Sequence, residues 1–462
     1  MREIFADAPE FVGASDSETI QNAIDFADRQ GIGKVTIPRI SPISGEPIWI
    51  IDKTILLPSD MTVILDNCHL RLGDGVRENI FRNKNAWTDV GRTQEGEQND
   101  IRVIGIGNAV LDGGKPNGLC EQLHRDDPEK YPHMQVNLLL FFHNVRNFEV
   151  RGFRCIDSRW WAVCFMYCRW GRISELDFRM YGTVENQDGV DIRIGCEYIT
   201  VENITGVTGD DTVALTALPN DRMFEGELRV KGRSLDIHDI TVRNVMSSTH
   251  GCGIVRLLNE DGAKEYNIKI SDITDTGETI GGAAVLIGTT DKVLMKEPHK
   301  MGEFKNIFIR NVTTSAQRVM SIREPVENMY IENVISSGQN ERGFAFGCNF
   351  EAKNVHISNF TFDSNKESAD CVFCFECGED AVKDMKISGV RASSAKYVFR
   401  GIEKEIDGLE CDEPSEGFFT PKLTKLASAY GRYHKYAYGK LITNRPSDSR
   451  FNTDDCQMKN KN

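Results

Sequence analysis

Short stretches that alternate hydrophobic and polar residues recur along the middle and C-terminal parts of the chain. Each follows the pattern apolar-x-apolar-x-(Asn/Asp/Gly)-apolar, which predicts a β-strand with one apolar face because successive strand side chains point to opposite sides. The stretches are Phe148–Phe153, Ile173–Phe178, Ile199–Ile204, Ile240–Val245, Ile268–Ile273, Ile307–Val312, Met329–Val334, Val355–Phe360 and Met385–Val390. None can bury its apolar face alone, which indicates that the strands stack on one another.

The spacing of these stretches predicts their arrangement. Successive start positions differ by 25, 26, 41, 28, 39, 22, 26 and 30 residues. Most steps therefore equal one turn of a solenoid, and the two long steps are turns that carry an inserted loop. The recurring Asn suits a bend, since Asn tolerates left-handed backbone and can hydrogen-bond to the turns above and below. Leucine-rich repeats and propellers need residue spacings that are missing here, so we predict an all-β fold, a single-stranded parallel β-helix.

The N-terminal end of this solenoid is predicted to carry a capping helix, since an open end exposes apolar core and unpaired strand edges. Ser15–Glu18 has the sequence of a capping box, and Gly31 provides a stop. The apolar face between them consists of Ile20, Ala23, Ile24 and Ala27. We expect residues 1–411 to form the capped β-helix and residues 412–462, which lack the strand pattern, to form a closing segment with a disordered tail.

The composition narrows the classes of function. The chain has 462 residues, 40% of them hydrophobic and 27% charged, whereas single globular cores usually stop growing near about 250–300 residues. No run of about 18 apolar residues occurs, so we expect no membrane span. The 69 acidic and 55 basic residues give a net charge of −14. This charge disfavours nucleic-acid binding by general electrostatics and leaves room for a local basic pocket.

The cysteines indicate a reducing environment. There are 13, an odd number without the spacing of a disulfide framework, and most lie in apolar strand-like contexts. The N-terminus also lacks the basic-then-apolar pattern of a secretory signal. We therefore expect a cytoplasmic protein, although a secreted chain trimmed of its signal has the same appearance. Cys371, Cys374 and Cys377 lie among apolar residues without a fourth ligand nearby, so we expect core thiols and no metal or other cofactor.

Aspartates cluster on two neighbouring turns of the predicted solenoid. Asn186–Asp191 reads Asn-Gln-Asp-Gly-Val-Asp, and Gly209–Asp211 reads Gly-Asp-Asp. Asp188 and Asp211 are 23 residues apart, one turn, and stacked turns lie about 4.8 Å apart. We expect Asp188, Asp210 and Asp211 to share one face. Such clustering raises at least one pKa, and it is typical of a cation site or of acid–base chemistry.

The next turn carries His250 and Arg256, and we expect His250 to stack near the aspartates. Hydrolysis of a glycosidic bond with inversion requires a protonated carboxylic acid and a carboxylate about 6.5–9.5 Å apart. Side chains on stacked turns can provide that separation.

From about Ser15 to Val334 the chain resembles glycoside hydrolase family 28, the polygalacturonase-like enzymes of the pectin-lyase-like β-helix superfamily. The family pattern of Asn-Thr-Asp-Gly, Gly-Asp-Asp and Gly-His-Gly is matched by Asn186–Gly189, Gly209–Asp211 and Thr249–Gly251. The resemblance implies a right-handed β-helix. It also implies an inverting hydrolase that acts on pectin-related, galacturonan- or rhamnogalacturonan-like, or other glycan oligosaccharides.

The resemblance further implies a role for each matched residue. Asp210 would protonate the leaving oxygen, while Asp188 and Asp211 would activate the water. His250 would hold the protonation state of the acid, and Asn186 would bind substrate hydroxyls.

The chain departs from the family where a sugar carboxylate would bind. The family carries Arg-Ile-Lys one turn after the histidine, and Gly281–Gly288 contains neither cation. Arg193 or Arg256 would have to substitute, and a neutral or differently linked sugar is an alternative. We also expect Trp160 to offer an aromatic surface to a sugar, although strand alternation should bury either Trp160 or its neighbour.

Two other functions stay open at this level. The first is a polysaccharide lyase or epimerase whose aspartates hold calcium. The second is a non-catalytic glycan-binding β-helix. In every case the expected partner is an oligo- or polysaccharide, with no nucleic acid and no membrane, and the oligomeric state is left open.

Overall fold

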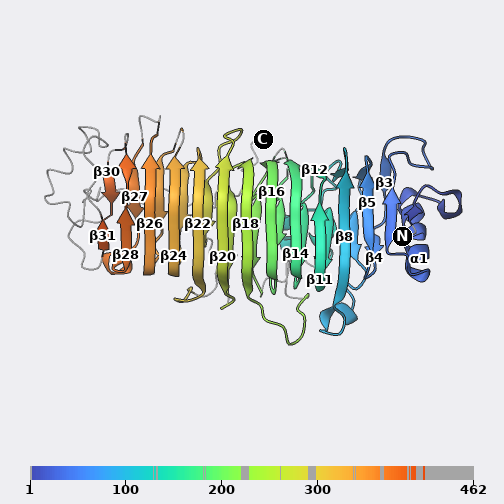
Figure 1. Cartoon of the computed structure of the whole chain (residues 1–462), viewed down its shortest axis with the longest axis horizontal. Helices are drawn as coiled ribbons and strands as arrows, with labels where there is room; N and C mark the ends of the chain where they lie inside the picture. The colour runs from blue at the N-terminus through green and yellow to red at the C-terminus, as the bar shows by residue number, and fades with distance from the viewer. Residues whose placement is uncertain are drawn as a thin grey trace. The chain divides into compact units, whose positions relative to one another are not determined.

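The structure is a computed structural model, and it forms two compact units, Met1–Thr241 and Val242–Asn462. It describes residues 3–411 except 128, 132–133, 181, 183, 220–227, 261, 290–297, 337, 339, 365–368, 393–394, 396 and 402–408. Each unit is built from right-handed, single-stranded parallel β-helix turns, as predicted (Figure 1). The predicted closing segment, 412–462, lies outside the described residues, and the domain boundary at 411 stays a prediction. No helix among the described residues has the length and hydropathy needed to cross a membrane.

A helix covers the first turn of unit 1 (Figure 1, blue). It is α1 (Asp16–Arg29), and the hydroxyl of Ser15 accepts a hydrogen bond from the Glu18 N–H at 3.3 Å. The helix packs on β2, β3 and β4, and its four predicted apolar residues are fully buried. Gly31 follows with φ +63°. The predicted cap is therefore confirmed.

Parallel strands form two sheets in unit 1. The first sheet pairs β1–β2–β5–β8–β11–β14–β16 and, beside it, β3–β6–β9–β12–β14. The other, here called the short-strand sheet, runs β4–β7–β10–β13–β15–β17. The first-sheet strands are β1 (Ile4–Phe5), β2 (Lys34–Ile37), β3 (Trp49–Ile51), β5 (Thr62–Asp66), β6 (His69–Leu72), β8 (Gln98–Ile106), β9 (Val110–Asp112), β11 (Val145–Arg151), β12 (Arg154–Ile156), β14 (Arg169–Arg179) and β16 (Glu197–Thr208). The short strands are β4 (Ile55–Leu57), β7 (Phe81–Asn83), β10 (Leu140–His143), β13 (Val163–Met166), β15 (Val190–Ile192) and β17 (Val213–Ala217).

Loops of unit 1 contain short helices, and its inner faces meet in an aromatic core. The helices are η1 (Pro9–Phe11), η2 (Val90–Arg92), α2 (Glu121–Asp126) and η3 (Met134–Asn137). The ring of Phe165 stacks on Phe148 with centroids 4.8 Å apart and meets Phe142 edge-on at 5.8 Å. These contacts fuse the apolar faces of successive turns into one core, as the alternating pattern requires.

One strand register in this unit differs from the sequence prediction. Aligning the repeats by their motifs matches Ile173 with Phe148, whereas the structure pairs Ile173 with Val150 and Gly171 with Phe148. A Cβ at Gly171 would lie 2.0 Å from the ring of Phe148, so only glycine fits there. The shift is two residues and keeps every side chain on its predicted face, which is why the sequence pattern could not reveal it.

Unit 2 continues the same construction. Its sheets pair β20–β22–β24–β26–β28–β31, with β29 beside β26, and β19–β21–β23–β25–β27–β30. Strand β18 (Ile237–Thr249) contains the division between the units. The other elements are β19 (Gly253–Asn259), β20 (Glu265–Asp275), β21 (Ala283–Ile287), β22 (Phe304–Thr314), β23 (Arg318–Ile322), β24 (Val326–Ser336), β25 (Arg342–Phe346), β26 (Ala352–Phe362), β27 (Cys371–Phe375), η4 (Glu379–Val382), β28 (Met385–Ser388), β29 (Arg391–Ala392), β30 (Tyr397–Arg400) and β31 (Leu409–Cys411).

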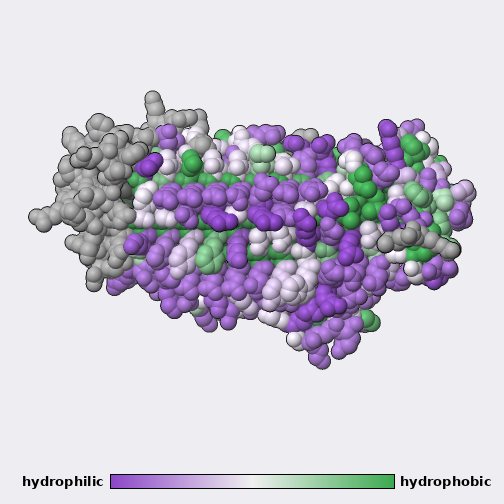
Figure 2. Space-filling view, viewed as in Figure 1, coloured by the Kyte–Doolittle hydropathy of each residue, from purple (hydrophilic) through white to green (hydrophobic). Residues whose placement is uncertain are grey.

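Asparagine ladders connect the turns of unit 2, and Figure 2 shows hydrophilic side chains in rows along it. Asn306, Asn328 and Asn354 have φ between +54° and +56° and pass side-chain amide hydrogen bonds of 2.8–3.0 Å from turn to turn. A second ladder contains Asn311 and Asn333. The role predicted for the Asn of the repeat motif is confirmed in the second ladder. One feature differs from the prediction, because these residues lie within long strands and bend them, whereas we expected them to follow short strands.

Candidate active site

The strand register of unit 1 stacks Asp188 directly beside Asp211. Val190 of β15 pairs with Val213 of β17, so the residues just before both strands are also aligned. The Gly189 N–H donates to the Asp211 carbonyl at 3.0 Å, which extends the ladder into this segment. One carboxylate oxygen of Asp210 and one of Asp211 lie within 4.8 Å of each other. The three aspartates thus come from two adjacent turns, as the 23-residue spacing predicted.

Local hydrogen bonds fix the Gly-Asp-Asp turn. The N–H groups of Gly209 and Asp210 donate to the Gln187 carbonyl at 3.0 and 3.3 Å. The Thr208 hydroxyl donates to the Asp210 carbonyl at 2.7 Å, and the Gln187 side-chain amide donates to the Ser158 carbonyl at 2.7 Å. Gln187 therefore links three turns, and the backbone positions of the aspartates are set before any ligand binds.

The acids lie in a strongly desolvated environment. Asp188, Asp210 and Asp211 are 5%, 4% and 6% exposed. Burial raises the pKa of Asp188 well above its ordinary value, and the neighbouring carboxyls of Asp191, Asp210 and Asp211 raise it further, while Arg193 lowers it. The Oδ1 atom of Asp188 has no hydrogen-bond partner among the described residues. The cluster consequently retains a proton at a pH where an exposed aspartate is ionised.

Asp191 is a member of the cluster that we did not predict. It is fully buried in β15. Of the neighbouring charges that raise the pKa of Asp188, the charge of Asp191 has the largest effect. The signal was present in the sequence as Asp188-Gly-Val-Asp191, but we assigned only Asp188 of this segment to the face shared with the Gly-Asp-Asp turn. Because Asp188 precedes the strand, alternation does not separate the two side chains.

Arg193 is held inside the cluster rather than presented to solvent. Its guanidinium lies 3.6 Å from the Asp191 carboxylate and 4.3 Å from the centre of the Trp161 ring. Only 3% of Arg193 is exposed. It partly neutralises the cluster and is already engaged, so it is a weak candidate for binding a sugar carboxylate.

Trp160 packs where we expected a sugar-binding surface. Its side chain is 0% exposed, and its ring stacks on that of Trp161 at 4.2 Å. Trp161 is buried as well, at 4% exposed, because Arg193 covers it. A fully buried ring has no face for a sugar, so Trp160 supports the site from below and does not enter the proposal.

Asn186 has the geometry expected of a hydroxyl-binding residue. It adopts left-handed backbone, φ +53°, and is partly exposed next to Gln187 and Asp188. Its side-chain amide makes no hydrogen bond with the described residues. The amide is thus available to donate to, or accept from, a sugar.

Two loops of unit 1 cover the outer face of the short-strand sheet near the cluster. The ring of Trp87 lies 5.7 Å from that of Phe141 in β10. On the same strand, Nε2 of His143 is 2.7 Å from the Leu228 carbonyl, and the two loops meet where the Lys231 N–H donates to the Arg92 carbonyl at 2.9 Å. Burial lowers the pKa of His143 to about 4, and Arg92 and Arg233 add to the effect, so it is a neutral packing residue.

The predicted residues His250 and Arg256 belong to unit 2. His250 is partly exposed in the turn after β18, and Arg256 is 6% exposed in β19. Their predicted functions stay predictions. At one position of the stretch that lacks the family's cations, a Cβ at Gly282 would lie 2.5 Å from the Gly251 carbonyl oxygen. The histidine turn approaches so closely that no side chain fits there.

Among the described acids of unit 1, Asp210 and Asp211 could hold one cation between them. The carboxylate oxygens of Asp210 and Asp211 are close enough to share a hard ion such as Ca²⁺. The guanidinium of Arg193 beside Asp191 reduces the negative potential that such an ion needs.

Comparisons with known proteins concern the same part of the chain. Residues 50–227, which contain Asp188, Asp210 and Asp211, match the model of glycosyl hydrolases family 28. No curated protein matches the chain. The resemblance to family 28 is thereby confirmed for the stretch that holds the acid cluster, and the family supports a glycoside hydrolase that acts on glycans.

Solved structures resemble the chain in fold. The A-module of the mannuronan C-5 epimerase AlgE4 from Azotobacter vinelandii has a TM-score of 0.57 at 10% identity, covering 88% of this chain and 99% of that one. A tailspike of E. coli bacteriophage HK620 in complex with pentasaccharide has a TM-score of 0.54 at 11% identity, covering 86% and 73%. A hyperthermoactive exopolygalacturonase from Thermotoga maritima has a TM-score of 0.47 at 14% identity, covering 86% and 88%. At these identities the likeness concerns the β-helix alone.

Proposed function

We propose that the protein is an inverting glycoside hydrolase that acts on pectin-related or other glycan oligosaccharides. The observation that carries the proposal is the buried carboxyl cluster of Asp188, Asp210 and Asp211 on two adjacent turns, inside the segment that matches family 28. Inversion needs one protonated and one ionised carboxyl group with a water between them. Burial and mutual repulsion keep a proton in this cluster, and Arg193 favours an ionised partner.

In this proposal Asp210 donates the proton to the leaving oxygen, and Asp188 and Asp211 orient and activate the water. The proton that the cluster retains is shared among coupled carboxyls, so it belongs to the group and not to one residue. Substrate can draw it to Asp210, while Asn186 binds a hydroxyl of the sugar beside the cleaved bond. His250 would hold the protonation state of the acid.

We infer that a chain end or a short oligosaccharide enters the site. The acids are 4–6% exposed, and the loops carrying Trp87 and Leu228 lie over the same face. A long polymer lying across the turns would need that face to be open. The engaged Arg193 further favours a reacting sugar that is not recognised through a carboxylate.

A calcium-dependent lyase or epimerase is the second candidate, because Asp210 and Asp211 have oxygens within 4.8 Å. Its chemistry removes a proton beside a carboxylate instead of adding water. The two reactions differ in product and in metal requirement, so one panel distinguishes them.

The test is incubation of the full chain with defined oligosaccharides, followed by NMR of the product anomers. We expect an inverted new reducing end, no effect of chelator, and a loss of about 10²–10⁴-fold in turnover for Asp210→Asn. Asp25→Asn, on helix α1, is the matched control and should retain activity. An unsaturated, ultraviolet-absorbing product that chelator abolishes would establish the lyase instead. Binding without turnover on the whole panel would indicate a non-catalytic glycan-binding protein.

A further inference from the structure

A groove with both polar and apolar walls crosses the N-terminal turns of unit 1. It consists of two adjoining hollows of about 830 and 490 Å³ that share His69, Asn108 and Val110. Its walls come from the end of β2 and from β6, β9, β12 and β14. These strands belong to five successive turns of the β-helix. Four steps of about 4.8 Å make the groove roughly 19 Å long. An elongated shape suits a chain-like ligand better than a compact one.

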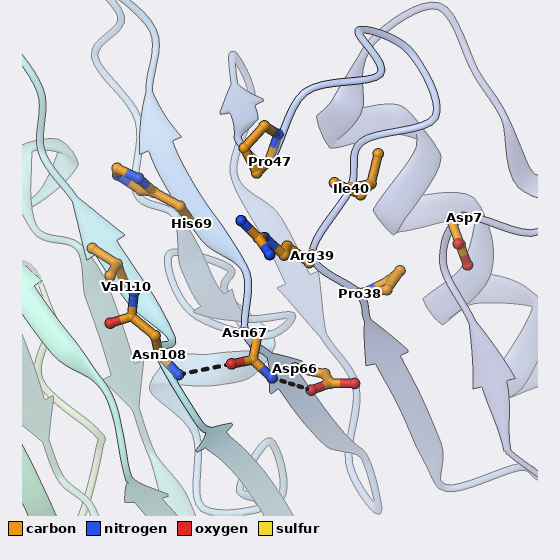
Figure 3. Close-up of a pocket in the computed structure, with 10 residues that line it drawn as sticks. All are labelled: Asp7, Pro38, Arg39, Ile40, Pro47, Asp66, Asn67, His69, Asn108 and Val110. Carbon is orange, nitrogen blue, oxygen red and sulfur yellow. Dashed lines mark hydrogen bonds between the residues drawn. The ribbon is translucent and has the colours of Figure 1, made fainter.

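The groove contains an uncommitted positive charge. Figure 3 shows Arg39 extending into the larger hollow toward the strand that carries His69. No ion pair or hydrogen bond of the Arg39 side chain occurs among the described residues. By contrast, Arg154 and Arg179 in the second hollow are committed to Asp177, at 2.7 and 3.3 Å. On a chain of net charge −14, an unpaired guanidinium in a concave surface is suited to a carboxylate, which it can bind in a bidentate manner.

Charged groups of both signs line the groove, since the carboxyl groups of Asp7 and Asp66 border the same hollow as Arg39. Nε2 of His69 is 2.8 Å from Asp112, which is itself buried and accepts the Gly114 N–H at 2.6 Å. The Asp112 carboxylate therefore fixes the orientation of the imidazole. Burial, together with Asp112, raises the pKa of Asp157 at the other end of the groove.

The remaining surface of the groove has the chemistry of a saccharide site. Pro38, Pro47 and Val110 offer apolar patches to sugar C–H faces, and the Asn108 side chain makes no hydrogen bond with the described residues. We propose that this groove is a second binding site, for an acidic oligosaccharide, in which Arg39 binds a sugar carboxylate and Asn108 binds hydroxyls. None of the acid-cluster residues lines the groove, so the proposal is independent of catalysis.

The experiment is titration of the full chain with a defined oligogalacturonate, with the site located by hydrogen–deuterium exchange. We expect protection of the segments around Arg39 and Asn108. Arg39→Gln should weaken binding at that site by about 10-fold or more, since it removes a charge-assisted hydrogen bond. Asn108→Trp, which fills the shared part of the groove, should abolish it. The matched control is Arg29→Gln, an exposed arginine of α1 outside the groove, which should stay within twofold of the original chain.

Three outcomes would overturn the proposal. The first is equal affinity in Arg39→Gln and the original chain. The second is equal protection by a neutral galactan oligosaccharide of the same length, which would show that the carboxylate is not recognised. The third is protection confined to the turns of Asp188 and Asp211. Circular dichroism of each variant verifies that the β-helix is intact before binding is compared.

Discussion

Replacing Asp188 by Asn tests the central physical claim, which is that the acid cluster is maintained at a cost in stability. Asp188 is buried, its Oδ1 has no partner among the described residues, and three carboxyls surround it against one guanidinium. An unsatisfied buried polar group costs about 1–3 kcal/mol, and more when it is charged. We therefore expect Asp188→Asn to raise the free energy of unfolding by about 1–3 kcal/mol at pH 8 while lowering turnover by about 10²–10⁴-fold.

The pH dependence of that gain follows from the direction of the pKa shift. The folded state raises the pKa of Asp188, so the original chain is favoured while the group is protonated and loses stability as pH rises from the unfolded pKa toward the folded one. Each unit between those two values is worth about 1.4 kcal/mol. The advantage of the Asn variant should accordingly vanish near the ordinary pKa of an aspartate, grow as pH rises toward the raised pKa of Asp188 in the folded chain, and level off above it.

The assay is urea-induced unfolding of both chains from pH 4 to pH 8, with Asp25→Asn as the control on a partly exposed aspartate of α1. Unfolding of a repeat architecture can depart from two states, so midpoints are compared at each pH rather than extrapolated energies. A stability difference that is absent, reversed or independent of pH would refute the desolvated cluster, whatever happens to activity.

Three further substitutions test other parts of the structure. Gly282→Arg should destabilise the fold by about 1–3 kcal/mol through overpacking, because its Cβ would lie 2.5 Å from the Gly251 carbonyl, and it should not create uronate binding. The control for thermal unfolding is Gly378→Arg, since no atom lies within 4 Å of a Cβ at that position. Asn328→Ala should cost about 2 kcal/mol, combining left-handed backbone strain with lost ladder bonds, and Asn328→Gly should recover the backbone part; equal losses would contradict this. Phe165→Ala, at the centre of the unit 1 core, should lower the free energy of unfolding by about 3–5 kcal/mol, and a loss below 1 kcal/mol would mean that the core is not closely packed.

Local chemistry of the chain predicted several features of the fold correctly. The capping box at Ser15 and the apolar face around Ile24 are short-range signals, and the structure confirms both. The interval of 23 residues between Asp188 and Asp211 likewise equals the length of one solenoid turn, so the two residues stack on adjacent turns. Such inferences succeed because each repeat contacts mainly its neighbours, so sequence distance maps almost directly onto position.

Features that depend on the packing of unrelated segments could not be obtained in this way. Alternation predicted that either Trp160 or its neighbour is buried, but it could not show that both are, because Trp160 stacks on Trp161 and Arg193 from the next turn covers Trp161. The lack of room for a side chain at Gly282 likewise depends on the approach of another turn. No sequence motif predicts the groove around Arg39, because its walls come from five turns and the lining residues share no periodicity.

The sequence by itself therefore determined the kind of solenoid, its capped end and the identity of the acids, because alternation, spacing and helix caps act over a few residues. The tertiary structure decided which of these groups are buried, that the acid cluster as a group retains a proton, and where an unpaired cation is exposed. Those properties depend on solvent exclusion and on charges brought together from distant turns, and neither quantity is defined until the turns have packed.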